Sequence, residues 1–289
     1  MDGWAEEKAM DNQRFSQIGF VALGGFARVY RAIDNWSGKT VAVKELINPT
    51  PDVLPRFQRE RDMLTIHRNN PFVVDILDSN FRGLNPYLVL EYASLGSLQK
   101  YVGNRRPWRR VAGWLFDISY GLTLIHERGD LVRDVKPSNL LRFKREDGSD
   151  LIKIADFGLG QRADNPFGQM TTSVFGTKGY IDPVALTSGK FRAASDIYSL
   201  GVTMRELLTG SRALWPGIPG PPEFQALIAS MTDADVEKRP TAREVFEQIR
   251  AILEAAVTAP VENHDANGLA WLLAGAAVIV GALLLGAGD

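Results

Sequence analysis

The hydrophobic pattern of this 289-residue chain changes period part-way along, and that change limits the folds available to it. Residues 16–47 alternate apolar and polar positions around a Gly24-Gly25 pair, which is typical of consecutive antiparallel strands. Beyond Ser97, apolar residues recur at intervals of three and four, which indicates amphipathic helices. The sequence therefore predicts an α+β protein, with a small β-rich lobe joined near residues 91–96 to a larger helical lobe.

The same patterns predict individual elements. A helix is expected over 53–67, followed by a pair of strands at 73–77 and 87–92. Further helices are expected in the second lobe at 111–125, 195–209, 222–231 and 241–255.

Composition limits the kinds of site. The formal net charge is −1, so the chain has no bulk basic field to attract nucleic acid, and no nucleic-acid partner is expected. Cysteine is absent and there are three histidines, which excludes thiol nucleophiles and argues against a histidine metal cage. Any metal is therefore expected to be a hard cation bound by carboxylate and amide oxygens.

Residues 269–287 carry no charged side chain. As a helix at ~1.5 Å per residue this run would be ~28 Å long, close to the ~30 Å hydrocarbon core of a bilayer. We expect a single transmembrane helix here, preceded by a linker at 257–268, with a buried core helix or a truncated segment as the alternative. No Lys or Arg follows Arg250, so the positive-inside rule gives no orientation.

Two features of the first lobe suit phosphate binding. Within 22–29, Gly24 and Gly25 would let backbone amides approach a phosphate closely, although a plain hairpin has the same pattern. Lys44 ends an apolar strand, and Glu60 follows sixteen residues later on the expected helix. A strand lysine held by a helix glutamate would be placed to contact the α and β phosphates of a nucleotide.

The most specific stretch is Val-Arg-Asp-Val-Lys-Pro-Ser-Asn at 132–139, followed seventeen residues after Asn139 by Asp156-Phe157-Gly158. Phosphoryl transfer needs a phosphate cradle, a divalent metal, a cation on the moving group and a carboxylate for the hydroxyl proton. Each need has a candidate in this chain. On these residues the chain resembles the eukaryotic-type protein kinase superfamily, over about 15–255.

The resemblance implies a two-lobed protein kinase fold, with the N-lobe at 15–92, the C-lobe at 97–256 and an extension at 1–14. It also implies phosphotransfer from ATP with Mg²⁺, Mn²⁺ being the alternative metal. The Lys-Pro-x-Asn form of the loop resembles serine/threonine kinases, which favours protein Ser and Thr hydroxyls as acceptors. We expect the protein to be a single-pass membrane protein with its kinase domain on the cytoplasmic side.

The resemblance also implies roles for particular residues. Asp134 would be the catalytic carboxylate and Lys136 the cation on the γ-phosphate, with Asn139 and Asp156 as metal ligands. The residues expected to bind the nucleotide are Ala22, Gly24, Gly25, Val29, Ala42, Lys44, Glu60, Glu91, Ala93 and Leu141.

Other residues resemble family positions that support the site or regulate the catalytic loop around Asp134. Leu90 resembles the gatekeeper, residues 91–93 the hinge, and Asp196 the residue that steadies the catalytic loop. Thr177 resembles the threonine that braces Asp134 and Lys136. Arg133 resembles the arginine that receives an activation-segment phosphate, which predicts autophosphorylation within 171–173 and self-association of neighbouring copies.

The chain departs from the family pattern in places. Ala22 and Ala27 stand at glycine positions, and Val132 stands where histidine is usual. Val184 stands where a glutamate would pair with the arginine matched by Arg239. Either Asp182 takes the place of that glutamate or Arg239 is more exposed, and the sequence leaves both open.

These departures keep a second hypothesis open, a catalytically weak pseudokinase that acts as a signalling scaffold at a membrane. A third hypothesis is a small-molecule kinase of the aminoglycoside-phosphotransferase type. The long segment 156–183, with Thr177 and Tyr180, resembles a peptide-docking region and favours a protein acceptor over a small molecule.

Overall fold

The computed structural model describes residues 13–158, 160, 179–213 and 217–258. They fall into two compact units. Unit 1 consists of the described residues up to Asn69 together with Val74–Ala93, and unit 2 consists of Asn70–Val73 together with the described residues from Ser94 onward.

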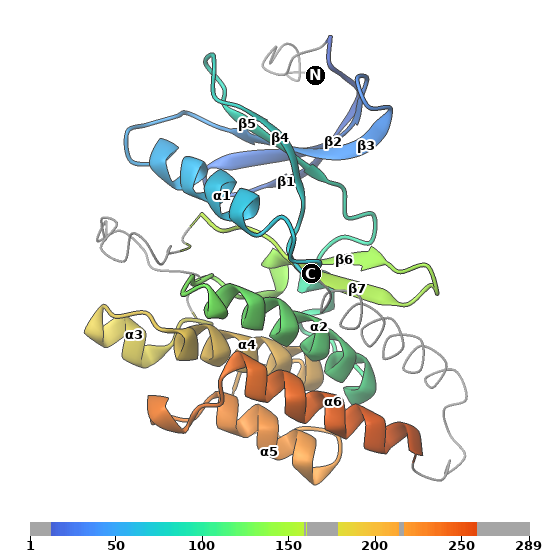
Figure 1. Ribbon diagram of the computed structural model, residues 1–289, viewed down its shortest axis with the longest axis vertical. Coiled ribbons are helices and arrows are strands. Elements are labelled where there is room, and N and C mark those ends of the chain that lie inside the picture. The colour runs from blue at the N-terminus through green and yellow to red at the C-terminus, as the bar shows by residue number, and fades with distance from the viewer. Residues whose placement is uncertain (1–12, 159, 161–178, 214–216, 259–289) are drawn as a thin grey trace, which may run out of the picture. The chain divides into compact units, whose positions relative to one another are not determined.

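Unit 1 is an antiparallel sheet with one long helix (Figure 1). The strand order is β1-β2-β3-β5-β4, and α1 (Leu54–Ile66) contacts β4. The strands are β1 (Phe15–Leu23), β2 (Ala27–Asp34), β3 (Lys39–Leu46), β4 (Ile76–Asn80) and β5 (Tyr87–Glu91). This sheet confirms the β-rich first lobe.

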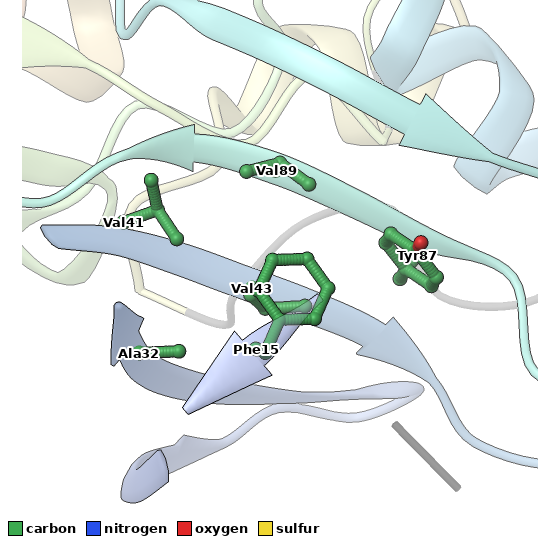
Figure 2. Close-up of a cluster of buried hydrophobic side chains, with 6 residues drawn as sticks. All are labelled: Phe15, Ala32, Val41, Val43, Tyr87 and Val89. Atoms are coloured by element: carbon green, nitrogen blue, oxygen red, sulfur yellow. The ribbon is translucent and has the colours of Figure 1, made fainter. Parts of the chain in front are cut away.

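One face of this sheet forms a hydrophobic core (Figure 2). Val41 and Val43 of β3 are both fully buried, because side chains two residues apart lie on the same face of a strand. Phe15 packs edge-on against Tyr87, with ring centroids 5.6 Å apart. Burial on the alternate positions of β3 fixes its register in the sheet, since a shift of one residue would expose these valines.

Unit 2 is mainly helical. Its long helices are α2 (Trp108–Glu127), α4 (Ala193–Thr209), α5 (Pro222–Met231) and α6 (Ala242–Thr258), which confirms the helical second lobe. A short helix α3 (Pro183–Ser188), a hairpin of β6 (Leu140–Lys144) and β7 (Asp150–Ile154), and the 3-10 turns η1 (Leu98–Tyr101), η2 (Pro137–Asn139) and η3 (Val236–Lys238) complete it. Helix α2 packs against α6, α4 and β7.

Some elements differ from those expected. The strand expected from residue 73 begins at Ile76, because Val73 instead makes an isolated bridge to Ile154 in unit 2. The β6–β7 hairpin was not predicted. Across the parts of the chain that are described, the helices are too short or too polar to cross a bilayer; residues 269–287 lie outside those parts.

Asp182 takes the place of the missing glutamate beside Arg239. The guanidinium donates to both carboxylate oxygens, at 2.8 and 3.0 Å, and the two side chains are 0% and 1% exposed. Val184, in contrast, is 40% exposed. The structure therefore selects the first of the two alternatives that the sequence left open, and Arg239 is fully buried.

The acidity of Asp182 reflects this pairing. Burial alone would raise its pKa, but hydrogen bonds from Arg239, the Val184 N–H and the Ser195 hydroxyl hold the pKa below its usual value. Because the folded pKa lies below the unfolded value, the carboxylate stabilises the fold at neutral pH. That contribution is lost as pH falls below about 4.

We predict that Asp182→Ala lowers the free energy of unfolding by ~3–5 kcal/mol, because it leaves the buried Arg239 guanidinium unpaired. Val184→Glu, which restores the usual family residue at an exposed site, should change it by less than about 0.5 kcal/mol. Denaturant unfolding at neutral pH measures both. Equal effects of the two substitutions would contradict the pairing.

Candidate active site

The strand register of unit 1 brings several predicted nucleotide-binding residues together. Ala22 of β1 pairs with Val29 of β2, and Val29 pairs in turn with Lys44 of β3. Ala42 lies two residues before Lys44 on the same strand and pairs with Leu90 of β5. Residues far apart in the sequence thus form two rows across the sheet, and within each row neighbouring strands lie ~4.8 Å apart.

A tight turn joins β1 to β2 at the two glycines. The Gly24 N–H donates to the Ala27 carbonyl at 2.8 Å. A Cβ on Gly24 would lie 3.3 Å from that oxygen, whereas a Cβ on Gly25 would meet no atom within 4 Å. Glycine at position 24 therefore suits the close approach of the backbone to Ala27. At position 25 the space that a side chain would occupy is empty.

Lys44 and Glu60 form an ion pair within unit 1. The ammonium lies 2.6 and 2.7 Å from the two carboxylate oxygens, and the side chains are 15% and 4% exposed. Partial burial strengthens such a pair relative to one in water. The contact that the resemblance implies between these two side chains is therefore present in the structure.

The residues expected to form the hinge lie at the end of β5. Leu90 is 8% exposed and pairs with Ala42 of β3 and Ile76 of β4. The Glu91 side chain accepts a hydrogen bond from the Asp75 N–H at 2.8 Å, and its own N–H donates to the Asp75 carbonyl at 3.0 Å. These bonds fasten the end of β5 to the residue before β4; Ala93 is the last residue of unit 1.

Three side chains meet around Asp134 in unit 2. The Lys136 ammonium donates to Asp134 Oδ2 at 2.7 Å. The Asn139 side-chain amide donates to the same oxygen at 3.1 Å and to the Asp134 carbonyl at 3.0 Å. The Asp134 carboxylate is thereby fixed through Oδ2, and no described residue donates to Oδ1.

The β6–β7 hairpin brings Asn139 and Asp156 to the same end of the unit. Leu140 pairs with Ile154, so the residues just outside the ladder are neighbours, and the Ala155 N–H donates to the Asn139 carbonyl at 2.8 Å. Asp156 follows directly. Antiparallel pairing therefore places two residues seventeen positions apart beside one another.

The donor set at this end fits a hard cation. Because the Asn139 amide nitrogen is bound to Asp134, its Oδ1 is turned the other way and is available as a ligand, with the Ser138 hydroxyl 3.2 Å from it. Asp156 adds a carboxylate. Mg²⁺ is typically bound by one or two such protein oxygens together with phosphates and water. Leu141, the predicted nucleotide contact, lies next along β6.

The loop before Asp134 is held by a buried carboxylate. Asp196 of α4 accepts hydrogen bonds from the Val132 and Arg133 N–H groups, at 3.0 and 2.7 Å. His126 Nε2 lies 2.9 Å from the same carboxylate. The role expected for Asp196 is matched by these contacts.

Two residues at the site have left-handed backbones, Arg133 at φ 68° and Asp156 at φ 64°. Such a conformation costs ~1–3 kcal/mol for a residue other than glycine and persists where surrounding bonds impose it. One directly precedes Asp134 and the other is itself a predicted metal ligand. The strain therefore lies at an expected metal ligand and at the residue that positions Asp134.

The structure thus places the predicted residues in two groups, one in each unit. Thr177 and residues 171–173 lie outside the described residues. His126 was missed, since nothing in the sequence links it to a carboxylate seventy positions away. Val132 is 0% exposed, so the valine fills a buried position where the family usually has histidine.

Comparison with known proteins agrees with this geometry. The family model of the protein kinase domain matches residues 14–249. The chain is 34% identical over 215 residues to the proline-rich receptor-like protein kinase PERK3 of Arabidopsis thaliana, covering 71% of this chain and 40% of the relative. It is 32% identical over 209 residues to the serine/threonine-protein kinase PknL of Mycobacterium tuberculosis, covering 71% of this chain and 51% of the relative.

The chain spans about half or less of the length of these curated relatives. The family match itself covers most of the chain, including both groups of site residues. This chain therefore belongs to the protein kinase domain family.

Proposed function

We propose that this protein is a serine/threonine kinase that transfers the γ-phosphate of ATP to protein hydroxyl groups. The observation that carries the proposal is the fixed carboxylate of Asp134, which Lys136 and Asn139 hold through one oxygen. A base must be held in place to accept a proton from an acceptor hydroxyl. Asp134 fulfils this need through its other oxygen.

Each remaining side chain has a role in this proposal. Lys136 donates a positive charge to the phosphoryl group as it moves, and Lys44, held by Glu60, binds the preceding phosphates. Asn139 and Asp156 bind the metal. When bound there, Mg²⁺ or Mn²⁺ neutralises phosphate charge and orients the nucleotide.

The departures from the family pattern are compatible with activity. Asp182 supplies the buried partner of Arg239, and Val132 is itself fully buried in the loop. These observations favour an active kinase over the pseudokinase scaffold. Transfer to Ser or Thr is supported by the Lys136 contact and by the Mycobacterium relative, which is named a serine/threonine-protein kinase.

We further propose that residues 269–287 tether the kinase to a membrane, with the kinase domain on the cytoplasmic side where ATP is present. The support is the uncharged sequence of this run. The Arabidopsis relative is named as a receptor-like kinase, which agrees with work at a membrane. Tethering raises the local concentration of neighbouring copies and favours phosphorylation between them.

The catalytic assignment predicts that Asp134→Asn lowers phosphotransfer by ~10²–10⁴-fold, because the base is lost while the shape is kept. Asp156→Ala and Lys44→Met should abolish measurable transfer, since each removes a group that binds the metal or the phosphates. Transfer of labelled phosphate from ATP to a basic protein measures the rates. Asp52→Asn, an exposed substitution of the same type, is the matched control and should keep full activity. Normal turnover in Asp156→Ala would refute the site.

Autophosphorylation is expected within 171–173, because Arg133 directly precedes Asp134 and an arginine can bind a loop phosphate. Arg133 also lies 4.4 Å from the Phe191 ring centroid, so its guanidinium is already held beside a structured segment. Mass spectrometry after incubation with Mg²⁺ and ATP should find phosphate on these residues, and none in Asp134→Asn. Full activity in a variant with alanine at 171, 172 and 173 would remove this switch.

The tether predicts that the full-length chain sediments with membranes and is released by detergent but not by high salt, because apolar burial is insensitive to screening. Removal of residues 269–287 should transfer the kinase to the supernatant with its phosphotransfer activity retained. Sedimentation of cell extracts followed by immunoblotting measures this. Full-length protein in the supernatant without detergent would contradict the tether.

A further inference from the structure

Four cations cluster where the chain enters α2: Lys100, Arg105, Arg106 and Arg109, which we call the basic edge. Lys100 and Arg105 are exposed, and the other two are partly exposed. The first turn of α2 contains no acidic residue, although cations at a helix N-terminus oppose the helix dipole. Proteins break such local rules at functional sites, which makes this surface a candidate for a binding role.

Aromatic rings support two of these arginines. The Arg106 guanidinium lies 4.5 Å from the Tyr101 ring centroid, and that of Arg109 lies 4.9 Å from the Trp108 ring centroid. Stacking orients the two side chains without neutralising them. The edge therefore presents held cations beside amphipathic rings.

The other two cations bind neutral groups. Lys100 donates to the Leu95 carbonyl at 2.7 Å, and Arg105 donates to the Thr209 carbonyl at 3.3 Å. Within the part of the chain that the structure describes, no carboxylate pairs with any member of the basic edge. Their positive charge is therefore not cancelled locally.

The acidic residues nearby are already bound by other arginines. Asp150 accepts from Arg142 at 2.6 Å and from Arg110 at 3.1 Å. Asp117, which is 1% exposed, accepts from Arg145 at 2.5 Å. These pairs leave the basic edge as a local surplus of positive charge, on a chain whose formal net charge is only −1.

The basic edge lies at the end of the unit where the described chain stops. Helices α2 and α6 run antiparallel: Arg243 pairs with Glu127 at one end, and the Phe246 ring lies 4.8 Å from that of Tyr120 further along. At ~1.5 Å per residue, α6 runs ~22 Å from Arg243 to its end at Thr258. Its last turn is thereby level with the first turn of α2 (Figure 1).

We propose that the basic edge docks onto the anionic headgroups of a lipid bilayer. This inference rests on the membrane tether proposed above: residues 259–268 can span at most ~35 Å, so the uncharged run begins within that distance of the basic edge's end of the unit. Each Lys or Arg close to an anionic bilayer strengthens association roughly five-fold. An acidic protein segment would also match the charge, but the position beside the exit of the chain favours the bilayer.

The chain contains no cysteine, so single thiols can report the orientation of the kinase. A fluorophore on Asn104→Cys marks the basic edge, and one on Ala234→Cys, exposed before the first turn of α6, marks the other end of that helix. The full-length protein is reconstituted into neutral phosphatidylcholine vesicles or into vesicles with about 30% phosphatidylserine, each carrying a headgroup quencher.

We expect the label at 104 to be quenched several-fold more strongly in the anionic vesicles than in the neutral ones, and the label at 234 to show no such difference. Salt at about 0.5 M should remove the difference, because it shortens the screening length to ~4 Å. Equal quenching at 104 in the two kinds of vesicle would overturn the proposal.

Charge reversal tests the residues themselves. Arg106→Glu with Arg109→Glu should lower the quenching at 104 to its level in neutral vesicles, a loss of association of roughly 25-fold or more. Lys190→Glu with Lys238→Glu makes the same change in charge elsewhere on unit 2 and should have no effect. If the first pair lowers the unfolding temperature, Arg106→Gln with Arg109→Gln replaces it, with a smaller expected loss.

The outcome separates docking from tethering. Sedimentation of the protein with neutral vesicles measures the tether alone. If the protein does not sediment with neutral vesicles, the tether is absent, and sedimentation with anionic vesicles still measures docking by the basic edge. Unchanged quenching in the Arg106→Glu, Arg109→Glu protein refutes docking even where the tether holds. Soluble polyglutamate that binds the basic edge when anionic vesicles do not would assign it to an acidic protein partner and overturn the proposal.

Discussion

The hydrogen bonds to the Asp196 carboxylate hold the loop on which the site depends. This side chain is 1% exposed, and it accepts two backbone N–H groups from the residues just before Asp134. Hydrogen bonds to an ionised acceptor are stronger than neutral ones, each contributing ~1.5–3 kcal/mol. They offset the ~1–3 kcal/mol cost of the left-handed Arg133 backbone and fix the direction in which Asp134 leaves the loop.

Helix α4 transmits this constraint to the rest of unit 2. Most of its side chains are buried, and Asp196 sits in its first turn. Near the same end, Ser195 donates to Asp182, which also receives Arg239. The start of one helix therefore anchors both the loop that carries Asp134 and the segment that begins α3, so these two regions share a support.

Although the usual glutamate is absent, the buried Arg239 guanidinium still has a carboxylate partner, Asp182. An unpaired guanidinium in the interior is costly, so a carboxylate has to lie within reach, but its position in the sequence is free to change. Asp182 lies two residues before Val184, and it reaches Arg239 from the N-terminal side of α3, where it also accepts the Val184 N–H. The same geometry leaves the valine at 184 exposed.

The sequence by itself determined the two-lobed α+β architecture and most of its helices, because periodic burial of apolar residues is a local property of the chain. Through its resemblance to the protein kinases it also pointed to Lys44, Glu60, Asp134, Lys136 and Asn139 as site residues, while the contacts that hold Asp134 came from the structure. Tertiary structure decided where β4 begins, the β6–β7 hairpin, the partner of Arg239 and the contact of His126 with Asp196. These depend on which distant groups meet in the interior, where each buried charge or N–H must find a partner, and no local pattern specifies that partner.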